Sequence, residues 1–284
     1  ILKQAYELQI KDFLKKLRIK KVELAIDGKQ DLYYGENGSL NVRQIKHENG
    51  ADEAWEYIVI SIIHPIKVPI MAVPYKQGDD LDKICMGLLE YSRSLPLTIT
   101  KVLFDRGFYH AHLIDYLESK KEQRPLPYLI LAKRDPSIKN YVQQTKGSLG
   151  VFRHTFNYNK HRSRWKPQTT IVVCKNAGKN KEGEWYDMIF ATNLKPSRTL
   201  VRQYSRRWNI ETGFRIMEEG KIKTKSNNPL IRLFYFLLRA LLTITWAMNN
   251  IVRIFMTYKG YLRAVEHKLR VVAKYKPPPI QPLY

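Results

Sequence analysis

The chain has 284 residues, enough to form one large domain or two smaller ones around a substantial core. Lysine and arginine number 49 against 26 aspartates and glutamates, which gives a formal net charge of +23. So large an excess is typical of a protein that binds a polyanion: nucleic acid is favoured, an anionic membrane surface also fits, and a purely solubilising role is the weaker explanation.

Disulfide, zinc and nucleotide chemistry have little support in the sequence. Cys85 and Cys174 lie far apart in apolar stretches, so two buried free thiols in a reducing cytoplasm are expected rather than a disulfide. No Cys-x-x-Cys pair occurs, and His110 and His112 have no cysteine nearby, so a zinc site is not indicated. The sequence has no Gly-Lys-Ser/Thr phosphate loop, so ATP dependence is not indicated either.

The first half of the chain predicts a helix, a group of strands, and then strands that alternate with helices. Residues 1–18 form a basic amphipathic pattern typical of a helix. The next elements expected are strands at 21–26, 41–47, 55–63 and 69–74, a helix at 80–95, a strand at 98–104, a helix at 109–121 and a strand at 127–132. Antiparallel strands followed by alternating strands and helices predict a mixed sheet covered on both faces.

The second half of the chain predicts an all-β insertion followed by helices. Strands are expected at 151–158, 169–174 and 184–190, separated by the basic run 160–166 and the turn-rich run 175–183. Helices are expected at 197–219 and 229–258, before a proline-rich extended tail. The expected parts are an N-terminal basic helix, the first part of a core, the insertion, the C-terminal helices of the core and a basic tail, at residues 1–20, 21–134, 135–191, 192–258 and 259–284.

Residues 233–251 are apolar enough to raise the question of a membrane span. Arg239 lies near the middle of this stretch, and a mid-membrane arginine costs about 2.5–3.5 kcal/mol on insertion scales. A helix buried within the protein is therefore expected, with a transmembrane helix as the alternative.

Three carboxylates stand in positions that predict a metal site. Asp27 and Asp105 each end a short apolar run, and Glu211 lies in an arginine-rich stretch. Two divalent ions about 3.5–4 Å apart can activate a nucleophile and absorb charge on a phosphate, and hard ions such as Mg²⁺ prefer carboxylate oxygens. The alternative is that Asp27 starts a turn and Asp105 caps a helix. Their combination in so basic a protein favours Asp27, Asp105 and Glu211 as the metal ligands and catalytic residues of an enzyme that cuts DNA.

The stretch around Glu211 predicts one functional helix face. On a continuous helix, Tyr204, Arg207 and Glu211 share a face, which Arg215 and Glu218 extend. An arginine one turn from a metal ligand could grip the phosphate of the scissile strand with two N–H groups. An ordinary salt bridge from Arg207 to Glu211 is the alternative.

These motifs resemble those of the prokaryotic insertion-sequence DDE transposases, in particular the group with a β-strand insertion and a Tyr-x-x-Arg-x-x-x-Glu-x6-Lys signature. The matching stretches are Ala25–Gly28, Phe104–Phe108 and Tyr204–Glu211, and the resemblance covers about residues 20–255. It implies an RNase H-like core in which the two aspartates and the glutamate bind two Mg²⁺ ions, with Mn²⁺ able to substitute. It also implies cleavage at transposon ends, followed by attack of the freed 3′-OH on another phosphodiester.

The resemblance implies DNA contacts near the cleaved end for Tyr204 and Arg207. The signature lysine falls on Glu218 in this chain, and Arg215 or Lys221 could take its place.

The insertion carries aromatic residues among basic ones, Trp165 and Arg164 included, which predicts a further DNA-contacting surface. Trp165 or Trp185 could stack on an unpaired base, a contact worth about 1–3 kcal/mol, whereas core packing of these tryptophans is the favoured interpretation.

The expected partners are double-stranded DNA, as transposon terminal inverted repeats and as target, and a second copy of the chain in the DNA complex. The expected location is the prokaryotic cytoplasm, at the nucleoid and not at a membrane. Two alternatives stay open: a metal-dependent RNase H-like nuclease without strand transfer, and a domesticated or inactive descendant that only binds DNA. Because the chain starts at Ile1 without a methionine, we expect a longer protein whose preceding residues help to recognise the ends.

Overall fold

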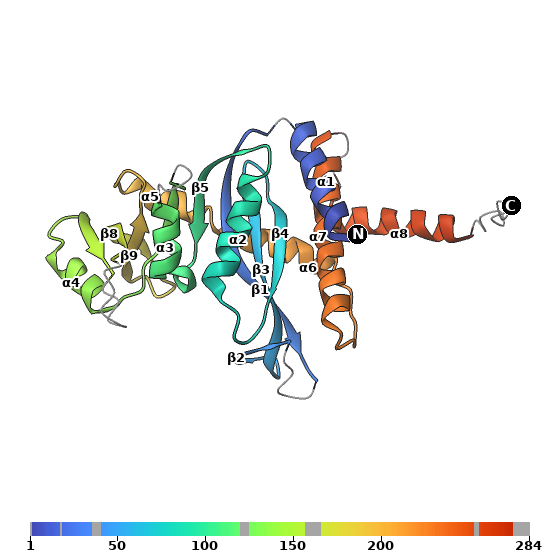
Figure 1. Cartoon of the computed structure of the whole chain (residues 1–284), viewed down its shortest axis with the longest axis horizontal. Coiled ribbons are helices and arrows are strands. Elements are labelled where there is room, and N and C mark those ends of the chain that lie inside the picture. Colours follow the sequence, from blue (N-terminus) through green and yellow to red (C-terminus); the bar gives the residue numbers. More distant parts are fainter. Residues whose placement is uncertain are drawn as a thin grey trace. The chain divides into compact units, whose positions relative to one another are not determined.

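The computed structural model of the chain divides into two compact units (Figure 1). The larger unit is Ile10–Gly213, and the smaller one combines Ile1–Gln9 with Phe214–Tyr284. The structure describes residues 2–17, 19–35, 41–119, 125–156, 166–252 and 256–274. The proline-rich segment 277–279 and most of the basic run 160–166 lie outside the described residues.

The larger unit is built on a mixed sheet of nine strands within the described residues. These strands are β1 (Lys21–Tyr33), β2 (Arg43–Glu48), β3 (Ala51–His64), β4 (Val68–Tyr75), β5 (Thr98–Phe104), β6 (Tyr128–Leu131), β7 (Leu149–Thr155), β8 (Gln168–Lys179) and β9 (Trp185–Thr192). Their order across the sheet is β2-β3-β1-β5-β6-β9-β8-β7, and β4 pairs with β3. Strand β5 runs parallel to β1 and β6, while the other pairs are antiparallel.

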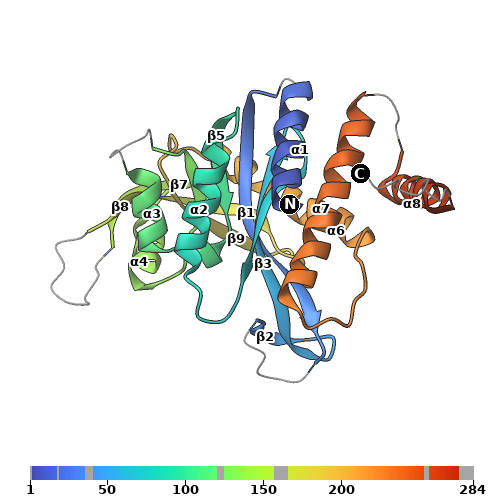
Figure 2. The same ribbon diagram turned by 45° about the vertical axis from the view of Figure 1, so that its right-hand side comes forward.

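Helices flank the sheet, as the alternating pattern predicts. Those described in the larger unit are α2 (Leu81–Arg93), the 3-10 turn η1 (Arg106–Phe108), α3 (Ala111–Glu118), α4 (Pro136–Gln144), α5 (Thr199–Ser205), the later part of α1 (Leu2–Leu17) and the first part of α6 (Trp208–Glu219). Helix α2 packs against α3 and against β3 and β4, and both views show α2 and α3 side by side over one face of the sheet (Figure 2). The N-terminus of α2 is fixed by Asp80, whose carboxylate accepts hydrogen bonds from the N–H groups of Asp82 and Lys83.

Strand β1 is longer than the sequence predicts, and this changes the position of Asp27. The Asp27-Gly28 pair predicts the end of a strand, but β1 continues to Tyr33 because its second half pairs with β3. Asp27 is therefore not a turn residue and pairs with Val59. The parallel pairing of β1 with β5 stops at Ile26, so Asp27 lies directly after the last parallel pair.

In its described residues, the region predicted as an all-β insertion contains one helix, α4, which the sequence analysis missed. Its signal is Asp135-Pro136, because the Asp135 carboxylate accepts a hydrogen bond from Ile138 N at 2.9 Å and proline is favoured in the first helical turn. The three expected strands are present as β7, β8 and β9. Since β9 pairs with β6, these strands extend the main sheet.

The smaller unit contains two long helices, α7 (Pro229–Val252) and α8 (Tyr258–Lys274), together with the last residues of α6 (Trp208–Glu219). Helix α7 is described as far as Val252, whereas the sequence predicts a helix to about 258, and Trp246 Nε1 donates to Met256 O at 2.8 Å. Among the described residues, α7 has the length and hydropathy to cross a membrane, which is weak evidence because the core helices of soluble proteins share both properties. Its Arg239 is buried, as are Cys85 and Cys174 of the larger unit, and both cysteines are free thiols as predicted.

Candidate active site

Asp27 lies on β1, and Asp105 directly follows β5, the parallel neighbour of β1 in the larger unit. The last parallel pair of β1 and β5 is Ile26 with Phe104, so both aspartates follow directly after that pair. Asp105 occupies the position before η1, but its side chain makes no capping hydrogen bond there. The helix-cap alternative for Asp105 and the turn alternative for Asp27 therefore have no support in the geometry.

The helix predicted from 197 to 219 is interrupted at Arg206 and Arg207, where the chain forms a turn between α5 and α6. Hydrogen bonds of the tighter i to i−3 type mark the break: Arg207 N donates to Tyr204 O at 2.8 Å, and Ile210 N donates to Arg207 O at 2.9 Å. The continuous helix expected through Tyr204, Arg207 and Glu211 is therefore wrong, but the three side chains still adjoin: Arg207 Cζ lies 5.9 Å from the ring centroid of Tyr204, and Arg207 also bonds Glu211.

Arg207 joins two of the three carboxylates. Its Nη1 donates to Asp27 Oδ2 at 2.9 Å, and its Nη2 donates to Glu211 Oε1 at 2.6 Å. The arginine side chain is 10% exposed, while that of Glu211 is 54% exposed. The salt bridge from Arg207 to Glu211, the alternative reading of this pair, is thus present, together with a second bridge to Asp27 that the sequence analysis did not foresee.

The electrostatics of Arg207 and Asp27 show that all three carboxylates act on one small region. Burial alone would lower the pKa of Arg207, but Tyr204, Asp27, Asp105 and Glu211 together raise it above its usual value. The pKa of Asp27 is raised to about 6: burial is the largest cause, Arg207 and the Gly28 N–H oppose it, and Asp105 and Glu211 add to the rise. Burial of Asp27, more than repulsion from the other carboxylates, is therefore what raises its pKa, and Arg207 is the largest opposing cause.

No three His, Cys, Asp or Glu side chains within the described residues are arranged to hold a metal ion directly. His110 Nδ1 lies 2.8 Å from Asp82 Oδ1. In the acidic region, the guanidinium of Arg207 takes the position between Asp27 and Glu211.

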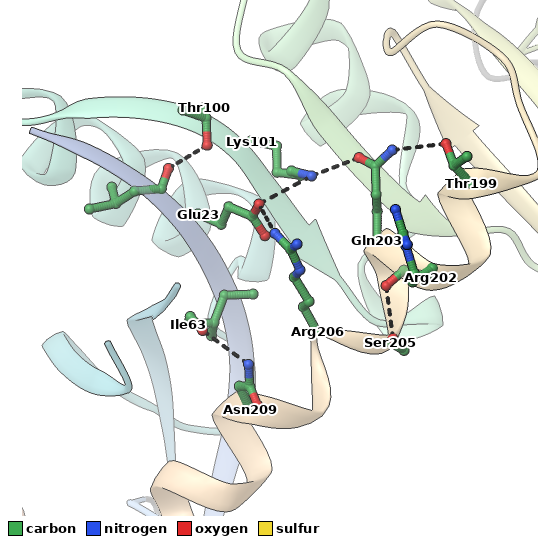
Figure 3. Close-up of polar contacts among 11 residues, drawn as sticks. Glu23, Ile63, Thr100, Lys101, Thr199, Arg202, Gln203, Ser205, Arg206 and Asn209 are labelled. Carbon is green, nitrogen blue, oxygen red and sulfur yellow. Dashed lines mark hydrogen bonds and ion pairs between the residues drawn. The ribbon is translucent and has the colours of Figure 1, made fainter. Parts of the chain in front are cut away.

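A second polar cluster joins the strands of the two aspartates to the segment that carries Arg207 (Figure 3). Lys101 Nζ lies 3.3 Å from Glu23 Oε1 and 2.6 Å from Gln203 Oε1, and Arg206 Nη1 also donates to Glu23 Oε1. Asn209 Nδ2 adds a bond of 3.0 Å to the carbonyl of Ile63 on β3. Sequence reasoning missed this cluster, although Glu23, a carboxylate inside the apolar run before Asp27, was its available signal.

Tyr204, which the resemblance assigns to a DNA contact, is a core residue in this structure. It is 4% exposed, its ring packs against Phe190, and its hydroxyl donates to Phe104 O at 3.2 Å. Burial raises the pKa of the Tyr204 hydroxyl. Tyr204 therefore supports the end of β5, one residue before Asp105.

The other residues predicted to contact DNA are Arg215, Lys221, Trp165 and Arg164. Arg215 is exposed on α6, and Lys221 Nζ lies 2.9 Å from Glu218 Oε1 in the smaller unit. Trp165 and Arg164 lie outside the described residues.

Two exposed tryptophans are candidate contacts of the larger unit. Trp185 is 60% exposed with Lys179 Nζ 4.9 Å from its ring centroid, so the core packing expected for it is wrong. Trp208, beside Arg207, is 63% exposed and was not assigned any role from the sequence.

Comparisons with known proteins identify a family whose model matches the chain and a solved structure with a similar fold. A model of the family described as the transposase DDE domain matches residues 77–243, more than half of the chain, and this span includes Asp105 and Glu211 but begins after Asp27. No curated protein matches the chain. Among solved structures, a cryo-EM structure of the piggyBac transposase synaptic complex with hairpin DNA is similar, with a TM-score of 0.61 and 12% sequence identity.

That structural match covers 96% of this chain and 61% of the solved chain, so the chain spans less than two thirds of the protein it matches. At this identity the likeness shows the fold alone. The fold is the RNase H-like transposase fold with a mixed sheet and flanking helices, as the sequence predicts.

Proposed function

Because the chain belongs to the family of transposase DDE domains, we propose that it cleaves transposon-end DNA and transfers the freed 3′-OH strand by two-metal phosphodiester chemistry. Asp27, Asp105 and Glu211 are the proposed catalytic carboxylates. The observation that carries the proposal is that one cation, Arg207, bonds both Asp27 and Glu211, while the charge of Asp105 also acts on it and raises its pKa.

The chemical type of these side chains suits divalent metal ions. All three carboxylates offer hard oxygen ligands, which Mg²⁺ and Mn²⁺ prefer. The guanidinium between Asp27 and Glu211 acts as a stand-in cation, since it occupies a place where positive charge is stabilised. When bound, divalent ions would supply a nucleophile at neutral pH and stabilise charge on the phosphate.

The side chains of this chain contribute positioning and charge. Strand β1 and the end of β5 hold Asp27 and Asp105 on a rigid sheet, and the bond from Tyr204 to Phe104 O fixes the end of β5. Arg207 keeps Asp27 and Glu211 together despite their repulsion, and its planar guanidinium can also bond two phosphate oxygens. The net charge of +23 attracts DNA and makes binding dependent on salt.

The proposed substrates are double-stranded transposon ends and target DNA, with two copies of the chain in the DNA complex, in the prokaryotic cytoplasm. A binding-only descendant is the second candidate, because Glu218 stands at the signature lysine position and is paired with Lys221 and with Arg239. A binding-only protein would keep its DNA affinity and show no dependence on Mg²⁺.

The test measures Mg²⁺- or Mn²⁺-dependent nicking and strand transfer on DNA that carries the ends of the element. The wild-type chain is compared with Glu211→Ala and with Glu219→Ala, which removes the same charge at the end of the same helix. The proposal expects products from the wild type and from Glu219→Ala and none from Glu211→Ala. Silence from all three chains, with tight DNA binding retained, would favour the binding-only descendant, and metal-dependent activity in Glu211→Ala would overturn the site.

A further inference from the structure

Four polar side chains form what we call the Glu23 cluster: Glu23, Lys101, Gln203 and Arg206 (Figure 3). Glu23 is on β1, Lys101 is on β5, and the other two belong to the segment that leads into α6. Glu23 Oε1 receives both cations, since Lys101 Nζ lies 3.3 Å away and Arg206 Nη1 donates to the same oxygen. Lys101 Nζ also donates to Gln203 Oε1 at 2.6 Å. The cluster thus joins three separate stretches of chain.

The register of the sheet places this cluster beside the proposed catalytic carboxylates. Glu23 and Lys101 are paired across β1 and β5, and each lies four residues before one of the aspartates, Asp27 and Asp105. Because side chains alternate along a strand, Glu23 and Asp27 share one face of β1. The irregularity that sets Lys101 opposite Glu23 lies at Thr100, whose Oγ1 donates to Val22 O at 2.8 Å.

The two consecutive arginines, Arg206 and Arg207, contact two carboxylates of β1 in the same order along the chain. Arg206 bonds Glu23, and Arg207 bonds Asp27, so the turn between α5 and α6 is held at two points of one strand. Glu211, one helical turn after Arg207, accepts a hydrogen bond from the same guanidinium. The position of Glu211 relative to Asp27 therefore depends on how firmly this turn is held.

Because the Glu23 carboxylate is buried, its two cations must stay close to it. Glu23 is 6% exposed, and its Oε2 accepts no hydrogen bond within the described residues. A buried carboxylate is tolerated when cations compensate it, and such buried ionic groups specify one arrangement more than they add stability. An exposed salt bridge would fix the turn far less well.

We propose that the Glu23 cluster is a positioning device for the proposed active site: it sets the distance of Glu211 from Asp27 and Asp105 by fastening the Arg206–Arg207 turn to β1 and β5. None of its four side chains needs to touch DNA or the ions. The inference rests on the proposed function and adds a set of residues that act through the carboxylates.

The test substitutes Glu23→Gln and Arg206→Gln and measures cleavage kinetics together with Mn²⁺ affinity by electron paramagnetic resonance. Because a misplacement of about 1 Å can cost about 100-fold in rate, kcat is expected to fall about 10- to 100-fold while the KM for DNA changes less than about two-fold. The affinity for Mn²⁺ is expected to fall several-fold. Arg206→Lys, which keeps the charge, is expected to recover part of both losses.

The matched control is Glu56→Gln. Glu56 is a similarly buried carboxylate, 10% exposed in its side chain, with Arg43 Nη1 at 2.7 Å from Oε2. It lies on the other face of the sheet, because a Cβ on Gly28 would meet its Oε1 at 2.8 Å and Gly28 faces away from Asp27. All measurements are made below the unfolding transition of each variant, and Glu56→Gln is expected to lose stability without losing kcat.

The outcomes separate this inference from the proposed function. Wild-type kcat and Mn²⁺ affinity in both Glu23→Gln and Arg206→Gln would overturn the positioning role while leaving the transposase proposal intact. If Glu23→Gln does not fold, Arg206→Gln carries the test, because the Arg206 side chain is 41% exposed. A wild type that neither cleaves DNA nor binds Mn²⁺ would overturn both proposals, whereas Mn²⁺ binding that weakens in the variants without any cleavage would support the positioning role alone.

Discussion

Arg207 Nη1 lies 2.9 Å from Oδ2 of Asp27, a residue 180 positions earlier in the chain. The same guanidinium bonds Glu211, so one cation offsets the repulsion between two carboxylates of the proposed metal site. A guanidinium in that position both stabilises the metal-free protein and competes with any divalent ion for the same oxygens. Removing the guanidinium should therefore lower the stability of the metal-free protein and raise its affinity for a divalent ion.

Arg207→Gln should therefore lower the stability of the metal-free protein and raise its affinity for Mn²⁺. The expected loss in unfolding free energy is about 2–3 kcal/mol, less than for a fully buried pair because Glu211 is half exposed. The expected gain in Mn²⁺ affinity is about ten-fold, because the competing cation is gone while Arg206 still fastens the turn to Glu23. Urea unfolding in EDTA and Mn²⁺ titration measure the two quantities. Arg207→Lys serves as the control that keeps the charge, and weaker Mn²⁺ binding in Arg207→Gln would contradict the argument.

Asp27→Asn should stabilise the metal-free protein at pH 8 and leave it unchanged near pH 3.8. The unfolded carboxyl loses its proton around pH 3.8, whereas the folded one keeps it up to about pH 6. Between these values the folded state binds more protons, so this group's contribution to stability falls as the pH rises. At high pH the buried, charged carboxylate lowers the free energy of unfolding by at most about 3 kcal/mol. The neutral amide of the Asp27→Asn variant carries no charge and so removes this loss.

Urea unfolding of wild type and Asp27→Asn in EDTA, across this pH range, gives the difference directly. A variant that is less stable than wild type at pH 8 would show that the bond to Arg207 outweighs the cost of burying the charge.

The strands of the core could be predicted well because their signals are local. The apolar run before Asp105 gave β5 with both of its boundaries, and the mixed sheet followed from the order of elements. The length of β1 could not be predicted, since residues after Gly28 are held in the strand by pairing with β3, a tertiary effect. The break at Arg206–Arg207 was missed for a similar reason: the sequence there favours helix, while bonds to Glu23 and Asp27 hold a turn.

The candidate site was predictable in its residue types but not in its arrangement. Asp27, Asp105 and Glu211 were chosen from the sequence, and the structure brings all three near one arginine. Their spacing could not show that Arg207 lies between two of them, because the i, i+4 rule describes only Glu211. The roles of these residues in metal binding and catalysis stay predictions until the cleavage assay is made.

Tyr204→Phe should cost stability and leave the binding of DNA unchanged. The hydroxyl donates to Phe104 O inside the core, and loss of this buried hydrogen bond costs about 0.5–1.5 kcal/mol. Thermal unfolding and the KM for end DNA measure the two effects. An undisturbed melting temperature with a several-fold rise in KM would instead show a direct DNA contact, as the resemblance implies.

Trp185→Ala should weaken the binding of DNA that carries an unpaired base. Trp185 is 60% exposed on β9, and Lys179 Nζ lies 4.9 Å from its ring centroid, so a flat apolar face and a cation are presented together to solvent. Stacking of a base on an aromatic ring is worth about 1–3 kcal/mol, which corresponds to about 5- to 150-fold in the dissociation constant.

Fluorescence anisotropy with a hairpin or gapped duplex, and with a fully paired duplex of the same length, measures the effect. Trp185→Phe keeps a ring that can stack and should retain most of the affinity. Because the loss is assigned to an unpaired base, the fully paired duplex should bind wild type and Trp185→Ala alike at the same salt concentration. Equal losses on both DNAs would assign Trp185 to a contact with the phosphate backbone, through Lys179, and not to base stacking.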